Sequence, residues 1–179
     1  MNITKTDFED LYLINYNSFT DLRGEFVKTI HDAAFESSQL DFKFHESFYS
    51  ISHKNVIRGM HFQSFPNDHC KLVYLVKGAI LDVVIDLRSG SSSFGQFYSV
   101  ELNEHTRQGL YIGKGFAHGF LSLTDDSLVE YHTTTAQSKD SENGIKWNSF
   151  GFDWGITDPI ISERDNNLSV FDSQYKYFI

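Results

Sequence analysis

The stretch that decides the fold is KLVYLVKGAILDVVIDLR, Lys71–Arg88. Two runs rich in Val, Leu and Ile meet near Gly78, which predicts two β-strands joined by a tight connection. Further short runs of aromatic and β-branched residues follow, with Gly, Asn, Asp and Ser between them: FGQFYSVEL, QGLYIG, HGFLSLT and SLVEYHTTT. Their spacing of roughly ten residues predicts a β-sandwich or β-barrel and disfavours alternating βαβ units.

The rest of the chain adds little regular structure to this pattern. HDAAFESS, His31–Ser38, is the best candidate for a helix, and it is short. The part after Ile145 has little periodicity, and we find neither a linker nor an internal repeat. We therefore expect residues 1–179 to form a single domain, and a chain of this length can bury a sizeable core.

Composition excludes several classes of protein. Hydrophobic residues make up 40% of the chain and aromatic residues 16%, more than a disordered chain carries. The net charge of -9 argues against a nucleic-acid partner, although a few clustered arginines still suit a small anionic ligand. The single cysteine, Cys70, allows neither an intrachain disulfide nor a Cys-rich zinc site.

The sequence also argues against a membrane partner. No apolar run approaches the roughly 20 residues that a bilayer-spanning helix needs. Charged residues interrupt the apolar part of the N-terminal stretch MNITKTDFEDLYLINY, which is unlike a secretory signal. We therefore expect a cytoplasmic protein.

Polar side chains recur on single faces of the predicted strands, because residues two apart in a strand point the same way. A small β-barrel would gather such side chains in or at the mouth of its interior, where ligand sites commonly lie. The sets that share a face are His61 with Gln63, Asp82 with Asp86, and Tyr131 with Thr133.

His61, in RGMHFQ, has three possible roles: packing, metal binding or proton transfer. A metal site in a barrel commonly uses two histidines one residue apart, but here the second position is Gln63, a poor ligand for a transition metal. A base is chemically reasonable because imidazole titrates near neutral pH, and it would need a carboxylate such as Asp165 or Asp82 to fix its tautomer. The residues alone leave packing and catalysis both open.

Other polar residues have the same ambiguity. Tyr131 either packs or donates a proton from its phenol, and Lys71 is either a solvated strand end or a cation that stabilises an enolate oxygen. Arg23 and Arg58 each precede a glycine, and their guanidinium groups suit phosphate oxygens. His118, in GKGFAHGF, is a second cavity histidine or a structural one.

Taken together, the motifs resemble one known family. DLRGEF, IRGMHFQ, the Lys71–Arg88 stretch, GFAHGFLSL, YHTT, GIKWN and PIISERD occur in the order found in the dTDP-4-dehydrorhamnose 3,5-epimerases, over roughly residues 10–166. The resemblance implies an all-β, cupin-type jelly roll with short peripheral helices that needs no metal and no cofactor. It also implies a homodimer in which an N-terminal strand pairs with the partner subunit.

The implied reaction is epimerisation of a nucleotide-linked 4-keto-6-deoxyhexose on the route to dTDP-L-rhamnose. His61 resembles the base, Asp165 the carboxylate that orients it, Tyr131 the acid across the sugar ring, and Lys71 the group beside the ketone oxygen. The substrate-binding residues that the resemblance implies are Arg23, Phe26, Glu46, Arg58, Gln63, Asp82 and His118.

The sequence departs from the family pattern around the substrate. Where the family commonly has a Gln-Asp-Asn run, this chain has Glu46, Ser47 and Phe48; ahead of Lys71 it has His69 and Cys70 in place of Gln-Gly. Inversion of a single carbon, or a CDP- or GDP-linked sugar, is therefore the closest alternative. A non-catalytic sugar-binding cupin and a metal-dependent cupin enzyme are the more distant ones.

Overall fold

In the computed structural model, which describes residues 1–178, the Lys71–Arg88 stretch forms two strands, β7 (Lys71–Lys77) and β8 (Ala79–Asp86). Gly78 joins them with φ +88°, and a Cβ atom there would lie 2.6 Å from Thr124 Oγ1. Only glycine tolerates both this backbone conformation and this close approach. The connection carries the chain from one sheet to the other, because β7 and β8 belong to different sheets.

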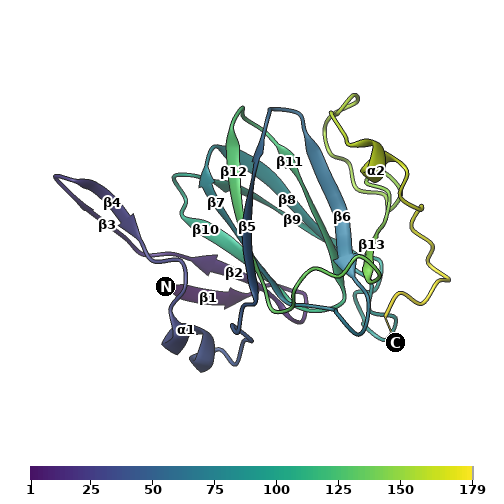
Figure 1. Cartoon of the computed structure of the whole chain (residues 1–179), viewed down its shortest axis with the longest axis horizontal. Helices are drawn as coiled ribbons and strands as arrows, with labels where there is room; N and C mark the ends of the chain where they lie inside the picture. The colour runs from purple at the N-terminus through teal and green to yellow at the C-terminus, as the bar shows by residue number, and fades with distance from the viewer. Residues whose placement is uncertain (179) are drawn as a thin grey trace.

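Two antiparallel sheets pack face to face and confirm the predicted cupin-type jelly roll (Figure 1). The six-stranded sheet has the order β1 (Asn2–Lys5), β2 (Leu11–Asn15), β10 (Gln108–Ile112), β7, β12 (Ser127–Thr133) and β5 (Glu46–Ser52). The five-stranded sheet has the order β13 (Glu142–Gly144), β6 (Ile57–Gln63), β11 (Phe116–Ser122), β8 and β9 (Phe97–Asn103).

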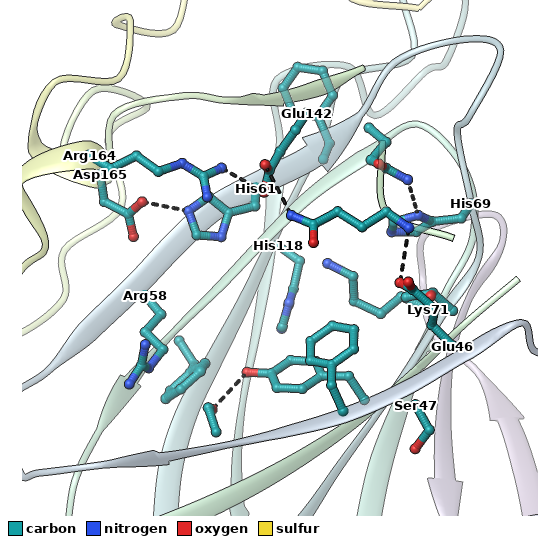
Figure 2. A pocket seen from close by; sticks show the side chains of 18 of the residues that line it. Glu46, Ser47, Arg58, His61, His69, Lys71, His118, Glu142, Arg164 and Asp165 are labelled. Atoms are coloured by element: carbon teal, nitrogen blue, oxygen red, sulfur yellow. Dashed lines mark hydrogen bonds and ion pairs between the residues drawn. The ribbon is translucent and has the colours of Figure 1, made fainter. Parts of the chain in front are cut away.

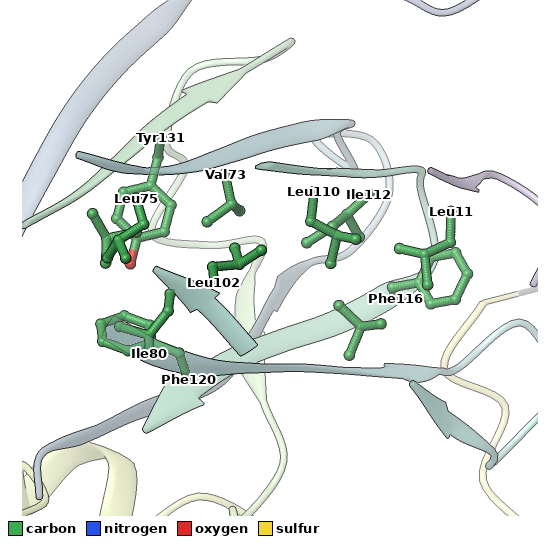
Figure 3. Packing of buried hydrophobic residues seen from close by; sticks show 12 residues of the cluster. Leu11, Val73, Leu75, Ile80, Leu102, Leu110, Ile112, Phe116, Phe120 and Tyr131 are labelled. Atoms are coloured by element: carbon green, nitrogen blue, oxygen red, sulfur yellow. The ribbon is translucent and has the colours of Figure 1, made fainter. Parts of the chain in front are cut away.

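The core lies between the two sheets. Figure 3 shows Val73 and Leu75 of β7 facing Ile80 of β8 and Phe120 of β11, and all four side chains are buried. Burial of each such side chain contributes about 1.5–3 kcal/mol to the free energy of folding. Tyr131 and Phe120 belong both to this core and to the lining of a cavity, so the packed core ends where the cavity begins.

The predicted helix is present as α1 (Asp32–Ser37), within the expected stretch. Its Phe35 packs on the outer face of the six-stranded sheet with Tyr12, Leu72 and Tyr111. The segment after Ile145 crosses the outer face of the five-stranded sheet and forms one further turn of helix, α2 (Glu163–Asn166), which the sequence did not predict. Ser162 caps α2, because its Oγ accepts a hydrogen bond from the N–H of Asp165 at 3.1 Å.

A two-stranded hairpin, β3 (Ser18–Asp21) and β4 (Gly24–Val27), projects away from the sheets (Figure 1). Three of its large apolar side chains, Phe19, Leu22 and Phe26, are more than half exposed. An apolar surface of this kind on a projecting element is typical of a protein contact. None of the helices in residues 1–178 is sufficiently long and apolar to span a bilayer.

Candidate active site

A cavity of about 570 Å³ opens between the two sheets (Figure 2). Strands β5, β7 and β12 of one sheet, β6 and β11 of the other, and the α2 segment all contribute to its lining. Eight of the eleven residues predicted for the site line it: Glu46, Arg58, His61, Gln63, Lys71, His118, Tyr131 and Asp165.

His61 and Asp165 form a hydrogen-bonded pair at the cavity wall. The Nε2 atom of His61 lies 2.7 Å from Oδ1 of Asp165, and the N–H of Gly59 donates to Oδ2 at 3.2 Å. Burial alone would raise the pKa of Asp165, but these hydrogen bonds hold it below its usual value. Because an ionised carboxylate only accepts, Nε2 of His61 carries the hydrogen and Nδ1 keeps a lone pair.

His118 forms a second pair of the same kind, deeper in the protein. Its Nε2 lies 2.9 Å from Oδ2 of Asp82, and both side chains are almost completely buried. Burial lowers the pKa of His118, against the opposing effect of the Asp82 carboxylate. Asp82 does not line the cavity itself. It lies behind His118, so the structure gives it a supporting position, where the sequence predicted a substrate contact.

Lys71 extends toward the middle of the cavity at the start of β7 (Figure 2). Its ammonium makes no hydrogen bond or ion pair with any side chain of residues 1–178. Burial lowers the pKa of Lys71 to about 8, and Asp82 partly opposes this shift. The group is therefore still mostly a cation at neutral pH, and it is available to an anionic or carbonyl oxygen.

Tyr131 reaches the cavity from β12, in the sheet opposite His61. Its hydroxyl lies 3.5 Å from Ser50 Oγ, and its ring stacks on Phe48 with 4.9 Å between centroids and 16° between planes. Burial raises the pKa of Tyr131 well above its ordinary value. The phenol therefore keeps its proton at neutral pH and is able to donate it.

Arginine side chains lie on the same side of the cavity as His61. Arg58 donates from Nε to Ser52 Oγ at 3.0 Å and from a terminal nitrogen to the carbonyl of Ile51 at 3.3 Å, which fixes its guanidinium at the cavity wall. Arg164 of α2 forms an ion pair with Glu142 of β13 at 2.8 Å (Figure 2). The remaining donors of Arg58 suit phosphate oxygens.

Gln63, predicted to bind substrate, is occupied by protein partners. Its side-chain amide donates to Nδ1 of His69 at 3.0 Å and to the carbonyl of Asn67 at 2.9 Å, and its oxygen accepts from the N–H of Ser138 at 2.6 Å. The amide therefore organises two loops at the base of the cavity. Because His69 accepts at Nδ1 and burial lowers its pKa to about 3, it is neutral and carries its hydrogen on Nε2.

Glu46 lies at the rim. Its carboxylate accepts a hydrogen bond from the backbone N–H of Gln137 at 2.9 Å, and the Gln137 side chain donates to Glu142 at 3.2 Å. These bonds connect β5, an edge of one sheet, to β13, an edge of the other. The rim is therefore a continuous polar chain from Glu46 to Glu142.

Besides Asp82, two predicted residues lie outside the cavity. Arg23 and Phe26 belong to the projecting hairpin; Arg23 pairs with Asp21 in the same hairpin, and Phe26 is 61% exposed. The structure of one chain therefore does not bring them to the residues that line the cavity. The contact between Arg23 and a neighbouring subunit's site, which the resemblance implies, stays a prediction.

Several residues that line the cavity were not predicted as site residues from the sequence: Phe48, His69, Gln137, Glu142 and Arg164. Phe48 and His69 had one signal, since both stand where the sequence departs from the family pattern. Gln137, Glu142 and Arg164 had none, because their position depends on how the segment after β12 folds back on β6.

The described histidines and carboxylates are not grouped as metal ligands. Within residues 1–178, no group of three or more His, Cys, Asp and Glu side chains is arranged to hold a metal ion. Each of the cavity histidines His61 and His118 bonds instead to a single carboxylate.

Comparisons with known proteins give a consistent result. A family model described as dTDP-4-dehydrorhamnose 3,5-epimerase matches residues 5–173. The Escherichia coli protein of that name is 39% identical over 176 residues, which cover 96% of this chain and 95% of the relative.

Solved structures agree with this. A dTDP-4-dehydrorhamnose 3,5-epimerase from Bacillus anthracis with TDP and PPi bound matches with a TM-score of 0.91 and 33% identity, over 95% of this chain and 99% of the other. A 3'-monoepimerase from Streptomyces bikiniensis in complex with dTDP-quinovose matches with a TM-score of 0.87 and 26% identity, over 93% and 86%.

Proposed function

The chain belongs to the dTDP-4-dehydrorhamnose 3,5-epimerase family and is an isomerase, and from this premise we propose how its cavity carries out the reaction. The substrate is a nucleotide-linked 4-keto-6-deoxyhexose, with dTDP-4-dehydro-6-deoxy-D-glucose as the best candidate and dTDP-4-dehydro-L-rhamnose as its product. The observation that carries the proposal is that an imidazole and a phenol from opposite sheets line one cavity.

His61 is the base. The ketone at C4 acidifies the protons on C3 and C5, and Nδ1 of His61 removes one of them. The Asp165 carboxylate, 2.7 Å from Nε2, holds the ring in the required tautomer and stabilises the imidazolium that forms. The ketone itself accepts the electron pair as an enolate.

Lys71 stabilises that enolate. Its ammonium lines the cavity and has no ion-pair partner within residues 1–178, and a fixed positive charge beside the C4 oxygen stabilises an enolate more in a buried site than in water. His118, held by Asp82, lies beside the same space and supplies a second polar group.

Tyr131 returns a proton to the opposite face of the ring. A proton that came back from the side of His61 would restore the original configuration, so inversion needs a donor across the cavity. Two observations support Tyr131 as this donor: it lines the cavity from the sheet opposite His61, and its buried phenol keeps its proton at neutral pH because burial raises its pKa. Solvent then takes the proton from His61 and returns one to Tyr131, and repetition at the second carbon completes a double epimerisation.

Arg58 binds the diphosphate, since its guanidinium is fixed at the cavity wall and has further N–H donors available.

We also propose a homodimer with exchange of an N-terminal strand, in which the hairpin of one subunit brings Arg23 and Phe26 to the cavity of the other. The exposed apolar side chains Phe19, Leu22 and Phe26 support this proposal. We also propose a cytoplasmic location, which agrees with the free thiol of Cys70.

Inversion of one carbon is the second candidate. The similarity to a 3'-monoepimerase and the departure from the family pattern at Glu46, Ser47 and Phe48 favour it. Both activities need the same base and the same acid, so they differ only in how many carbons the cavity presents to them.

The test is incubation with dTDP-4-dehydro-6-deoxy-D-glucose in D2O, followed by NMR. Deuterium at both C3 and C5 with net inversion supports double epimerisation, and deuterium at one carbon supports the second candidate. No exchange at either carbon, with the CDP- and GDP-linked sugars tested in parallel, would remove the enzymatic proposal in favour of a non-catalytic binding protein. Elemental analysis with a chelator test addresses the metal-dependent alternative.

A further inference from the structure

The acid proposed above, Tyr131, depends on one edge strand for its position. In the register of β12 and β5, Tyr131 stands directly opposite Phe48, and β12 is the only strand paired with β5 within residues 1–178. The same strand supplies Ser50, whose Oγ is the hydrogen-bond partner of the Tyr131 hydroxyl. Both contacts therefore come from a strand that is paired on only one side.

The hydrogen bond is the weaker of these two contacts. At 3.5 Å it lies at the long end of the range, where an O–H···O bond contributes little. The ring contact is well formed by comparison, with 4.9 Å between centroids and nearly parallel planes. Packing, more than hydrogen bonding, therefore decides where the phenol oxygen lies.

The geometry of tyrosine explains what such packing controls. The phenol oxygen lies on the axis of the χ2 rotation, so a ring flip leaves it in place, whereas rotation about χ1 sweeps it through an arc. Phe48 covers one flat face of the ring and blocks this rotation toward β5. His118 lies edge-on, with 6.3 Å between centroids, on another side of the ring.

We infer that Phe48 is a positioning residue for Tyr131: its ring fixes the χ1 angle of the tyrosine, so that the hydroxyl points across the cavity from His61. This inference rests on the proposed function. It assigns to Phe48 a role in proton return and none in proton removal, because His61 belongs to the other sheet and is held by Asp165.

A purely structural role is the alternative, because a cross-strand aromatic pair also stabilises a sheet edge. The structural role and the positioning role predict different effects of replacing Phe48. Loss of edge stability would lower the melting temperature and reduce all steps of the reaction alike, whereas loss of positioning would reduce inversion while proton removal continues. Phe48 is 48% exposed, so its replacement leaves no cavity in the core.

The experiment compares Phe48→Asn, Phe48→Leu and Phe48→Tyr with the wild type in D2O. The quantity measured is the ratio of solvent exchange at C3 and C5 to net inversion. Phe48→Tyr keeps a stacking ring, and Phe48→Leu keeps apolar bulk without one. Phe65→Asn is the matched control, because Phe65 is 83% exposed and does not line the cavity.

We expect the ratio of exchange to inversion to rise about 10-fold in Phe48→Asn, part of the roughly 10²–10⁴-fold that a general acid supplies in full. Phe48→Leu should lie between Phe48→Asn and the wild type. Phe48→Tyr and Phe65→Asn should keep the wild-type ratio. An unchanged ratio in Phe48→Asn, in an otherwise active enzyme, would overturn the inference and leave the proposed function intact.

A second measurement does not depend on turnover. In protein labelled with 3-fluorotyrosine, the ¹⁹F resonance that disappears in Tyr131→Phe belongs to Tyr131. Loss of Phe48 should shift and broaden this resonance, because the ring samples more than one χ1 angle, and should lower the pH at which it titrates. An unaltered resonance in Phe48→Asn would refute positioning even if the wild type showed no epimerase activity.

Discussion

His61 and His118 stand directly opposite each other on the neighbouring strands β6 and β11, and each bonds through Nε2 to its own carboxylate. Burial distinguishes the two pairs. The His118 and Asp82 side chains are 4% and 0% exposed, whereas the His61 side chain is 30% exposed to the cavity. Burial lowers the pKa of His118 and keeps it neutral. His61 is therefore the more accessible of the two histidines, which agrees with the proposal that it is the base.

Replacing the base should stop the reaction without unfolding the protein. In His61→Gln the side-chain amide can still donate to Asp165, but it has no basic nitrogen. We expect turnover and solvent exchange at C3 and C5 to fall together by about 10²–10⁴-fold. NMR in D2O measures both, and thermal unfolding provides the control for the fold. Exchange at the wild-type rate would mean that another group removes the proton.

Replacing the acid should separate the two halves of the reaction. Tyr131→Phe keeps the ring that stacks on Phe48 and loses only the hydroxyl. We expect solvent exchange to persist while net inversion falls by about 10²-fold or more, since only protonation from the far face is lost. The ratio of deuterium incorporation to product formation is the measurement. Inversion at the wild-type rate would show that Tyr131 is not the acid.

The pKa of Lys71 predicts the alkaline limit of activity. Burial lowers this pKa from 10.5 to about 8, so the cation is present below pH 8 and is lost above it. If the cation stabilises the enolate, kcat/KM should decline about 10-fold per pH unit above pH 8.

The matched variant is Lys71→Arg, whose side chain stays charged at these pH values. Its rate should be lower than that of the wild type, but the alkaline decline should disappear from its profile. A wild-type profile that stays flat to pH 10 would contradict the role given to Lys71.

Asp165 should make the stability of the protein depend on pH. Its folded pKa lies below the ordinary value of 3.8, so its ionised form stabilises the fold above pH 3.8. This contribution disappears as the pH falls through the folded pKa. We expect Asp165→Asn to lose about 1.5–3 kcal/mol of stability at pH 6, the range for a hydrogen bond to a charged group.

Denaturant unfolding at pH 6 and at pH 3 measures this effect. The difference between the wild type and Asp165→Asn should shrink at the lower pH. Asp158→Asn is the control, because Asp158 is exposed and should show no such trend. A difference of equal size at both pH values would show that the carboxylate is not stabilised by its partners.

The sequence pattern predicted which side chains of a single strand share a face. Alternation placed Tyr131 and Thr133 on one face of β12, and His61 and Gln63 on one face of β6, and all four line the cavity. It did not show that the Gln63 side chain forms hydrogen bonds with His69, Asn67 and Ser138. Those partners lie in loops whose folding depends on the whole chain. Alternation also placed Asp82 on the inner face of β8, but its carboxylate lies behind His118 and does not line the cavity.

By itself, the sequence predicted an all-β sandwich or barrel, through its short β runs and the turn near Gly78, and its ordered motifs resembled one family, which implied the jelly roll. Strand patterns did not show which side chains meet: the resemblance implied the contact between His61 and Asp165, and only the tertiary structure gave its geometry and the contact between Phe48 and Tyr131. The pairing of His61 with Asp165 spans 104 positions, and the stacking of Phe48 on Tyr131 follows from strand register. Such contacts are fixed by hydrogen-bonded sheets and packed segments far apart in the chain, and local alternation carries no information about them.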